Sequence, residues 1–156
     1  MSELLVRDRM QGQPPTVSPD TGVADLANLL ADERLSSVPV VEDGKLIGMV
    51  GQRDLIFQEL EQDDVDMPHT LPIMGGVIFL ERMDHWRERF RRAFGTTVRD
   101  LMAAEVHTIP PQVTLHEAAR RMIDHDVSRL PVVDEAGAVV GVISRADVVR
   151  ALAEEW

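Results

Sequence analysis

Residues 128–133 read SRLPVV, and residues 36–41, in the first half of the chain, read SSVPVV. Each stretch is followed by a turn sequence and a second run rich in β-branched residues. The flanking sequence repeats in the same order, since VRDRM at 6–10 returns as VRDLM at 98–102. A segment that recurs in order predicts two equivalent structural units, which can pack about a pseudo-two-fold axis and leave a groove between them.

Each repeat is predicted to hold a short helical piece, an extended link, a helix, two strands and a closing helix. In repeat two, a capping box opened by Thr114 starts a helix that runs to about Asp124. In repeat one, Asp43 and Gly44 supply the positive φ angles of a hairpin turn, and the second hairpin carries an extra turn residue at Ala136. The order β-α-β-β-α predicts a small α/β (α+β) unit in each repeat.

An insert separates the repeats. We expect repeat one at residues 1–61, the insert at 62–97 and repeat two at 98–156. Pro72 and the pair Gly75–Gly76 predict irregular chain in the first part of the insert.

The later part of the insert has the pattern of an amphipathic helix. Large apolar residues recur there at steps of three or four, opposite a polar face. They are Phe79, Met83, Trp86, Phe90 and Phe94. Such a stripe either packs on its own domain or forms a surface for a dimer or another partner, and the sequence leaves both readings open.

The composition excludes several classes of protein. The chain has 27 acidic and 16 basic residues and a net charge of -11, which argues against nucleic acid as a partner. It has no cysteine, and its five histidines lack the spacing of a closed metal site, so we expect no metal. The charged N-terminus and the lack of a long apolar run predict a cytoplasmic protein without membrane contact.

The paired motifs resemble those of CBS domains, named after cystathionine beta-synthase. VRD-x-M, S-x-x-PVV and a glycine six residues before an aspartate all occur twice, in the same order, outside the insert. The resemblance implies two packed sheets with helices outside, and a module that dimerises. It also implies that AMP, ADP, ATP or S-adenosylmethionine binds in clefts between the repeats, the nucleotides with or without magnesium.

The resemblance further implies a ribose site at the start of each closing helix. In repeat two, Asp147 can accept hydrogen bonds from a cis-diol, and Ser144 can add a contact. The same pair can also cap the helix, and one pair can serve both roles. Repeat one keeps Asp54 but has Gly51 in place of the serine. A missing hydrogen bond weakens binding by about 0.5–1.5 kcal/mol, so we expect a stronger site in repeat two and a weaker or vestigial one in repeat one.

Ligand phosphates need cations. Arg129 occupies the position before the strand proline from which the family often reaches phosphate, whereas repeat one has Ser37 there. Arg145 and Arg53, inside the ribose motifs, are further candidates, because a guanidinium binds phosphate in a bidentate manner.

Family position also implies apolar walls for the adenine, although the same residues can simply be ends of core strands. They are Thr108, Ile109, Leu130, Pro131 and Val132 in repeat two, and Thr16, Val17, Val38 and Pro39 in repeat one.

We therefore expect a regulatory module that senses an adenosine nucleotide and signals to an unidentified partner protein. The alternative is a nucleotide-independent scaffold that binds proteins through the insert helix and the dimer surface. The sequence shows no nucleophile paired with a base and no glycine-rich phosphate loop, so we do not expect an enzyme. Apolar residues of the closing helices also favour a homodimer: Leu55, Ile56, Leu60, Val148, Val149 and Leu152.

Overall fold

The computed structural model describes residues 4–61, 70–79, 85, 95–103 and 105–155. The chain divides into two compact units, and each unit takes segments from both repeats. Unit 1 consists of Met1–Ser18, Val38–Met49 and Ala103–Trp156, and unit 2 consists of Pro19–Ser37 and Val50–Met102. The repeat and insert boundaries given above stay a prediction, because a compact unit is not the same thing as a sequence repeat.

The first repeat has the predicted order of elements. They are α1 (Val6–Arg9), β1 (Gln11–Gly12), α2 (Val23–Asp32), β2 (Ser37–Glu42), β3 (Lys45–Gly51) and α3 (Gln52–Glu61). Strands β2 and β3 form a two-stranded sheet. Their turn has φ angles of 52° at Asp43 and 76° at Gly44, as the sequence predicts for a tight hairpin.

The second repeat follows the same order, except that its described residues hold no strand equivalent to β1. Its elements are α5 (Val98–Leu101), α6 (Leu115–Asp124), β6 (Arg129–Val133), β7 (Val139–Ser144) and α7 (Arg145–Glu155). Helix α6 begins where the sequence predicts, since the Thr114 hydroxyl accepts a hydrogen bond from the Glu117 amide at 3.2 Å. The Glu117 carboxylate accepts a hydrogen bond from Arg121 Nε at 2.9 Å, one turn further on. The predicted α/β class is confirmed.

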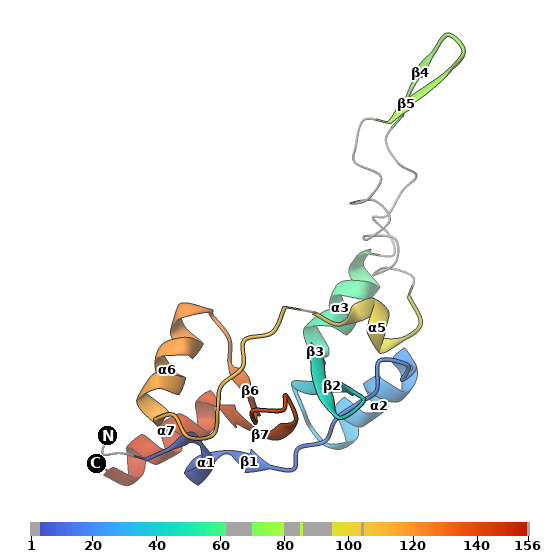
Figure 1. Cartoon of the computed structure of the whole chain (residues 1–156). Coiled ribbons are helices and arrows are strands. Elements are labelled where there is room, and N and C mark those ends of the chain that lie inside the picture. The colour runs from blue at the N-terminus through green and yellow to red at the C-terminus, as the bar shows by residue number, and fades with distance from the viewer. Residues whose placement is uncertain (1–3, 62–69, 80–84, 86–94, 104, 156) are drawn as a thin grey trace. The chain divides into compact units, whose positions relative to one another are not determined.

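The sheet of unit 1 has the strand order β1-β7-β6, so the start of the chain extends the hairpin of repeat two (Figure 1). Strand β7 pairs antiparallel with both neighbours, with Gln11 opposite Val142 and Arg129 opposite Ser144. This exchange between the repeats is reciprocal. In unit 1 the Val6 amide donates to the Val113 carbonyl at 2.8 Å, and in unit 2 the Val98 amide donates to the Thr21 carbonyl at 2.9 Å. Both units therefore place the short helix of one repeat at the start of the longer helix of the other.

The core of unit 1 lies between α6, α7 and the sheet. Its side chains come from both repeats and are almost entirely buried: Val6, Ile109, Leu115, Ala118, Met122, Leu130, Val132, Ile143, Val148 and Ala151. Full burial of one large apolar side chain contributes about 1.5–3 kcal/mol, so this cluster holds α6, α7 and the strands of repeat two together. Val148, which the sequence predicts to belong to an exposed apolar face for a homodimer, is only 5% exposed and belongs to this core. That prediction was wrong because Val148, together with Ala151, lies on the side of α7 that packs into the core.

The first part of the insert differs from the expectation. It forms an antiparallel hairpin of β4 (Thr70–Ile73) and β5 (Gly76–Phe79), with φ of 89° at Gly75 in the turn. The prediction of irregular chain was wrong, because both strands of a two-stranded hairpin are edge strands. A proline such as Pro72, opposite Val77, is tolerated where its missing amide hydrogen is not needed.

The predicted aromatic helix is only partly covered. Phe79 ends strand β5, so it does not start a helix as expected. Met83, Trp86, Phe90 and Phe94 lie outside the described residues. Among the residues that the structure describes, no helix combines the length and the apolar character needed to cross a bilayer.

Candidate functional site

A cavity of about 460 Å³ lies within unit 1, in the size range of small-molecule sites. The N-terminal segment, the ends of the two strands of repeat two and the first turns of α7 form its walls. The lining residues are Arg9, Met10, Gln11, Arg129, Val142, Ser144, Ala146, Asp147 and Arg150. The pairing of β1 with β7 brings the first three of these residues to the others.

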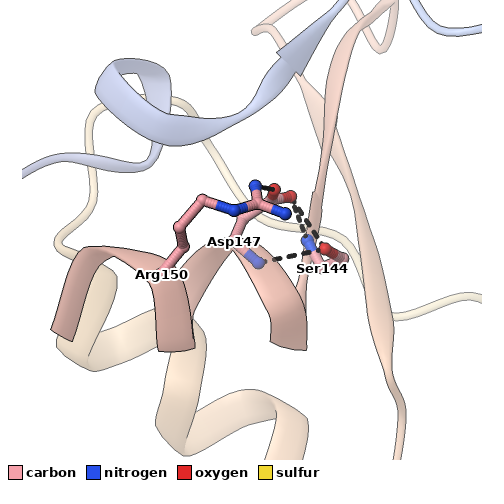
Figure 2. A network of polar contacts seen from close by, with 3 residues as sticks. All are labelled: Ser144, Asp147 and Arg150. Atoms are coloured by element: carbon pink, nitrogen blue, oxygen red, sulfur yellow. Dashed lines mark hydrogen bonds and ion pairs between the residues drawn. The ribbon is translucent and has the colours of Figure 1, made fainter. Parts of the chain in front are cut away.

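Ser144 and Asp147 form a reciprocal helix cap in this cavity (Figure 2). Asp147 Oδ2 accepts hydrogen bonds from the Ser144 amide at 2.9 Å and from the Ser144 hydroxyl at 2.8 Å. The Asp147 amide donates to the Ser144 hydroxyl oxygen at 3.2 Å. The capping role is therefore present, and it fixes the orientation of the carboxylate.

The second oxygen of that carboxylate has a more easily replaced partner. Arg150, one turn along α7, reaches Asp147 Oδ1 with Nη1 at 3.2 Å, and Figure 2 shows its side chain folded toward the carboxylate. The Arg150 side chain is 71% exposed, whereas that of Asp147 is 19% exposed. Ion pairs of exposed side chains contribute little to stability, so a ligand hydroxyl can compete for Oδ1.

The corresponding position in repeat one is built differently. The Gly51 amide donates to Asp54 Oδ2 at 2.9 Å, so the backbone part of the cap is kept. A Cβ atom on Gly51 would lie 2.8 Å from Ser37 Cβ and would contact the Ser36 carbonyl oxygen more closely still. Glycine is required there by the close approach of the backbone, a constraint that the sequence comparison of the repeats does not reveal.

The candidate phosphate ligands separate into two groups. Arg129 lines the cavity, and its guanidinium makes no hydrogen bond or ion pair with the described residues. Arg145 does not line the cavity, and its Nη2 lies 3.4 Å from Asp126 Oδ1. Arg53 is an exposed residue of α3 in unit 2.

Two cavity arginines were missed by the sequence analysis. Arg9 reaches the cavity from α1 and forms an ion pair with Glu154. Arg9 could not be found from the sequence, because its position depends on pairing between the two ends of the chain. Arg150 could have been found, since it lies three residues after Asp147 on one helix, a spacing that brings side chains together.

The expected adenine walls do not line the cavity. Ile109, Leu130, Pro131 and Val132 are buried, and the Thr108 carbonyl accepts a hydrogen bond from Arg121 Nη1 at 3.0 Å. In repeat one, the Val17 amide donates to the Pro39 carbonyl at 3.0 Å. Val17, Val38 and Pro39 are buried, whereas Thr16 is exposed. These residues form strand ends and bridges of the core, and their contact with adenine stays a prediction.

The histidines show one contact. His107 and His125 stack with ring centroids 3.6 Å apart and an angle of 11° between the ring planes. Neither ring lines the cavity. Within the described ranges, no three histidine or acidic side chains gather in a way that could hold a metal ion.

Comparison with known proteins gives a family for both repeats. The family model of the CBS domain matches residues 6–61 and 98–154. The uncharacterized protein MJ1426 of Methanocaldococcus jannaschii is 30% identical over 155 residues, which cover 96% of this chain and 91% of that protein. The chloroplastic CBS domain-containing protein CBSX2 of Arabidopsis thaliana is 29% identical over 140 residues, which cover 86% of this chain and 57% of CBSX2.

Solved structures agree with this match. The crystal structure of CBSX2 in complex with AMP gives a TM-score of 0.80 at 28% identity, over 97% of this chain and 98% of that one. The CBS domain pair of protein MJ0100, solved with 5-methylthioadenosine and S-adenosyl-L-methionine, gives a TM-score of 0.72 over 99% of both chains. Its identity is 21%, so that likeness concerns the fold alone. With both repeats matched by the family model, the chain belongs to the CBS-domain family as a tandem pair of CBS domains.

Proposed function

We propose that this chain is a regulatory module that binds an adenosine nucleotide and that repeat two provides the principal site. The supporting observation is the cavity of unit 1, which brings Ser144 and Asp147 together with the guanidinium of Arg129, which has no partner within the described part of the chain. These are the groups expected for ribose and for phosphate. The relative CBSX2, 28% identical to this chain, has been solved with AMP.

The two oxygens of the Asp147 carboxylate would have different roles. Oδ2 is held by the Ser144 amide and hydroxyl and keeps the side chain in place. Oδ1 faces the exposed Arg150 and is the oxygen that a ribose hydroxyl would take. Hydrogen bonds to a charged carboxylate are stronger than neutral ones, so this contact would anchor the sugar. The N-terminal amides of α7 lie beside it and favour a nearby phosphate.

Calorimetric titration with AMP, comparing Asp147→Asn with Asp54→Asn, tests this proposal. Both aspartates cap a closing helix through the same backbone contact, at 2.9 Å in each repeat, so Asp54→Asn controls for the loss of that backbone contact, although Asp147 also accepts a hydrogen bond from the Ser144 hydroxyl. A hydrogen bond to a charged group contributes about 1.5–3 kcal/mol. Since 1.4 kcal/mol corresponds to a tenfold change, Asp147→Asn is expected to weaken AMP binding by roughly 10- to 100-fold.

The Asp54→Asn variant is expected to have the smaller effect. Equal losses in the two variants would contradict the assignment of the principal site to repeat two. No binding heat with millimolar AMP, ATP, adenosine or S-adenosylmethionine would contradict the nucleotide-sensing role itself.

We also propose that the module works as a homodimer and acts on its partner protein without catalysing a reaction. Large apolar side chains remain exposed on the closing helices, with Ile56 at 62% and Leu60 at 65% on α3 and Val149 at 62% on α7. Exposed apolar groups of this kind favour protein contacts. Light scattering after gel filtration tests the dimer, and a monomer at micromolar concentration would contradict it. The alternative scaffold function depends on the insert helix, which lies outside the described residues, and stays a prediction.

A further inference from the structure

The charge of the cavity differs sharply from that of the chain. Three arginines line it, each from a different element: Arg9 from α1, Arg129 from β6 and Arg150 from α7. Asp147 is the acidic residue among the lining residues. The chain as a whole has a net charge of -11. A local excess of guanidinium groups on so acidic a protein creates a field that attracts anions into this cavity.

Each of the three guanidinium groups can be made available to a ligand. Arg129 has no partner among the described residues. Arg150 is held by Asp147 in a pair whose arginine side is 71% exposed. Arg9 is held by Glu154, whose side chain is 51% exposed. Exposed ion pairs are weak, whereas bidentate contacts of arginine with phosphate are strong and directional, so a phosphate can draw both residues from their present partners.

The ion pair between Arg150 and Asp147 couples the binding of the ribose to the binding of the phosphate. A ribose hydroxyl that donates to Asp147 Oδ1 takes the position now held by Arg150 Nη1. The released guanidinium stays at the cavity wall, because its backbone is fixed on α7 one turn from Asp147. A phosphate attached to the same ribose would restore a partner for this arginine. Adenosine, which lacks the phosphate, would displace Arg150 without compensation.

We propose that Arg9, Arg129 and Arg150 make this cavity selective for anionic, phosphate-bearing adenosine ligands, with Arg150 passing from Asp147 to the ligand phosphate. S-adenosylmethionine is disfavoured, because its sulfonium and ammonium groups outweigh its one carboxylate and would bring a net positive charge among three guanidinium groups. This inference rests on the proposed function and adds to it the charge class of the ligand and two specificity-determining residues, Arg9 and Arg150.

Titration of the full chain with AMP, adenosine and S-adenosylmethionine tests the selectivity. The unmodified chain is expected to bind AMP at least tenfold more tightly than either of the other two ligands. AMP binding is expected to weaken as salt is raised, while adenosine binding stays nearly constant, because salt screens charge–charge attraction. The result that would overturn the inference is binding of adenosine or S-adenosylmethionine within twofold of AMP. Failure of all three ligands to bind would overturn the proposed function and the inference together.

Three substitutions identify the residues. Arg150→Gln is expected to weaken AMP binding at least fivefold, because the phosphate loses a partner. Adenosine is expected to bind as tightly as before or more tightly, because Asp147 Oδ1 is then free to accept from the ribose. Glu154→Gln removes the ion-pair partner of Arg9 and is expected to increase the affinity for AMP. Arg120→Gln, an exposed arginine of α6 outside the cavity, removes the same charge and serves as the control, with no expected change. Equal weakening of AMP and adenosine by Arg150→Gln, or an Arg120→Gln variant that loses as much AMP affinity as Arg150→Gln, would overturn the assignment.

Discussion

The substitution Gly51→Ser distinguishes between two expectations, one from alignment of the repeats and one from the structure around Gly51. Gly51→Ser would give repeat one the hydroxyl that repeat two has in Ser144, so alignment of the repeats predicts a restored second site. The backbone around Gly51 predicts destabilisation instead. A Cβ atom would lie 2.8 Å from Ser37 Cβ and 3.0 Å from Ser37 Cα, and closer still to the Ser36 carbonyl oxygen. Optimal carbon contacts are about 3.5–4.0 Å, so the surrounding backbone would have to move by roughly 0.5–1 Å.

That movement has an identifiable cost. The Ser36 carbonyl accepts a hydrogen bond from the Gln52 amide at 2.9 Å, which helps to hold the first turn of α3. Loss of this bond costs about 1 kcal/mol, and overpacking of a closely packed site costs about 1–3 kcal/mol. The sum is a free energy of unfolding lowered by about 2–4 kcal/mol. In a protein of this size each kcal/mol corresponds to about 2–4 °C, so the melting temperature is expected to fall by about 5–15 °C.

Thermal unfolding followed by circular dichroism, with AMP titration of the same samples, measures both outcomes. Gly12→Ser is the matched control, because a Cβ atom on Gly12 would meet nothing within 4 Å. The control is expected to melt within about 2 °C of the unmodified protein, a shift worth less than about 1 kcal/mol. If Gly51→Ser melts as the control does, or gains a second AMP site, the argument from backbone proximity is refuted.

Three further substitutions test the packing around the site. Gly141→Ala would place a Cβ atom 2.9 Å from the Gln11 carbonyl oxygen. Amide hydrogen exchange in β1 is therefore expected to become faster, and the free energy of unfolding is expected to fall by about 1–3 kcal/mol. Unchanged exchange would contradict the close packing of β1 on β7. Thr114→Ala removes the cap of α6 and is expected to cost about 1 kcal/mol in urea unfolding, whereas an unchanged midpoint would show that the cap contributes nothing. Leu130→Ala, at a residue with 0% exposure, is expected to cost about 2–5 kcal/mol, and a loss below 1 kcal/mol would mean that its neighbours collapse into the space.

The elements that depend on local sequence could be predicted. Thr114 caps α6 as its spacing to Glu117 indicates, and Asp43 and Gly44 adopt the positive φ angles that their types favour. Such features depend on interactions between residues close in sequence, so the pattern of residue types contains the information. The Ser144 and Asp147 pair is of the same kind, and its joint presence with Arg129 at one cavity follows from the antiparallel register of two consecutive strands.

The features that depend on distant contacts could not be predicted. Arg9 reaches the cavity because β1 pairs with β7, and nothing in two residues of sequence specifies that partner. Glycine is required at position 51 because the backbone of Ser36 approaches it closely. Alignment of the two repeats shows only that Gly51 lacks the hydroxyl of Ser144, and it does not reveal this contact. Pro72 predicts irregular chain from the sequence, whereas the structure places it in a strand, because a proline signals a break unless its strand is known to lie at an edge.

Strand β1 also sets the timing of folding during synthesis. A ribosome makes Gln11 and Gly12 well before the strand that pairs with them, β7, because every other described strand lies between the two in the sequence. Unit 1 therefore cannot close until β7 has been made, and until then β1 lacks its native partner. A chain that stops before residue 139 would lack β7 and α7 and would leave this early segment permanently unpaired.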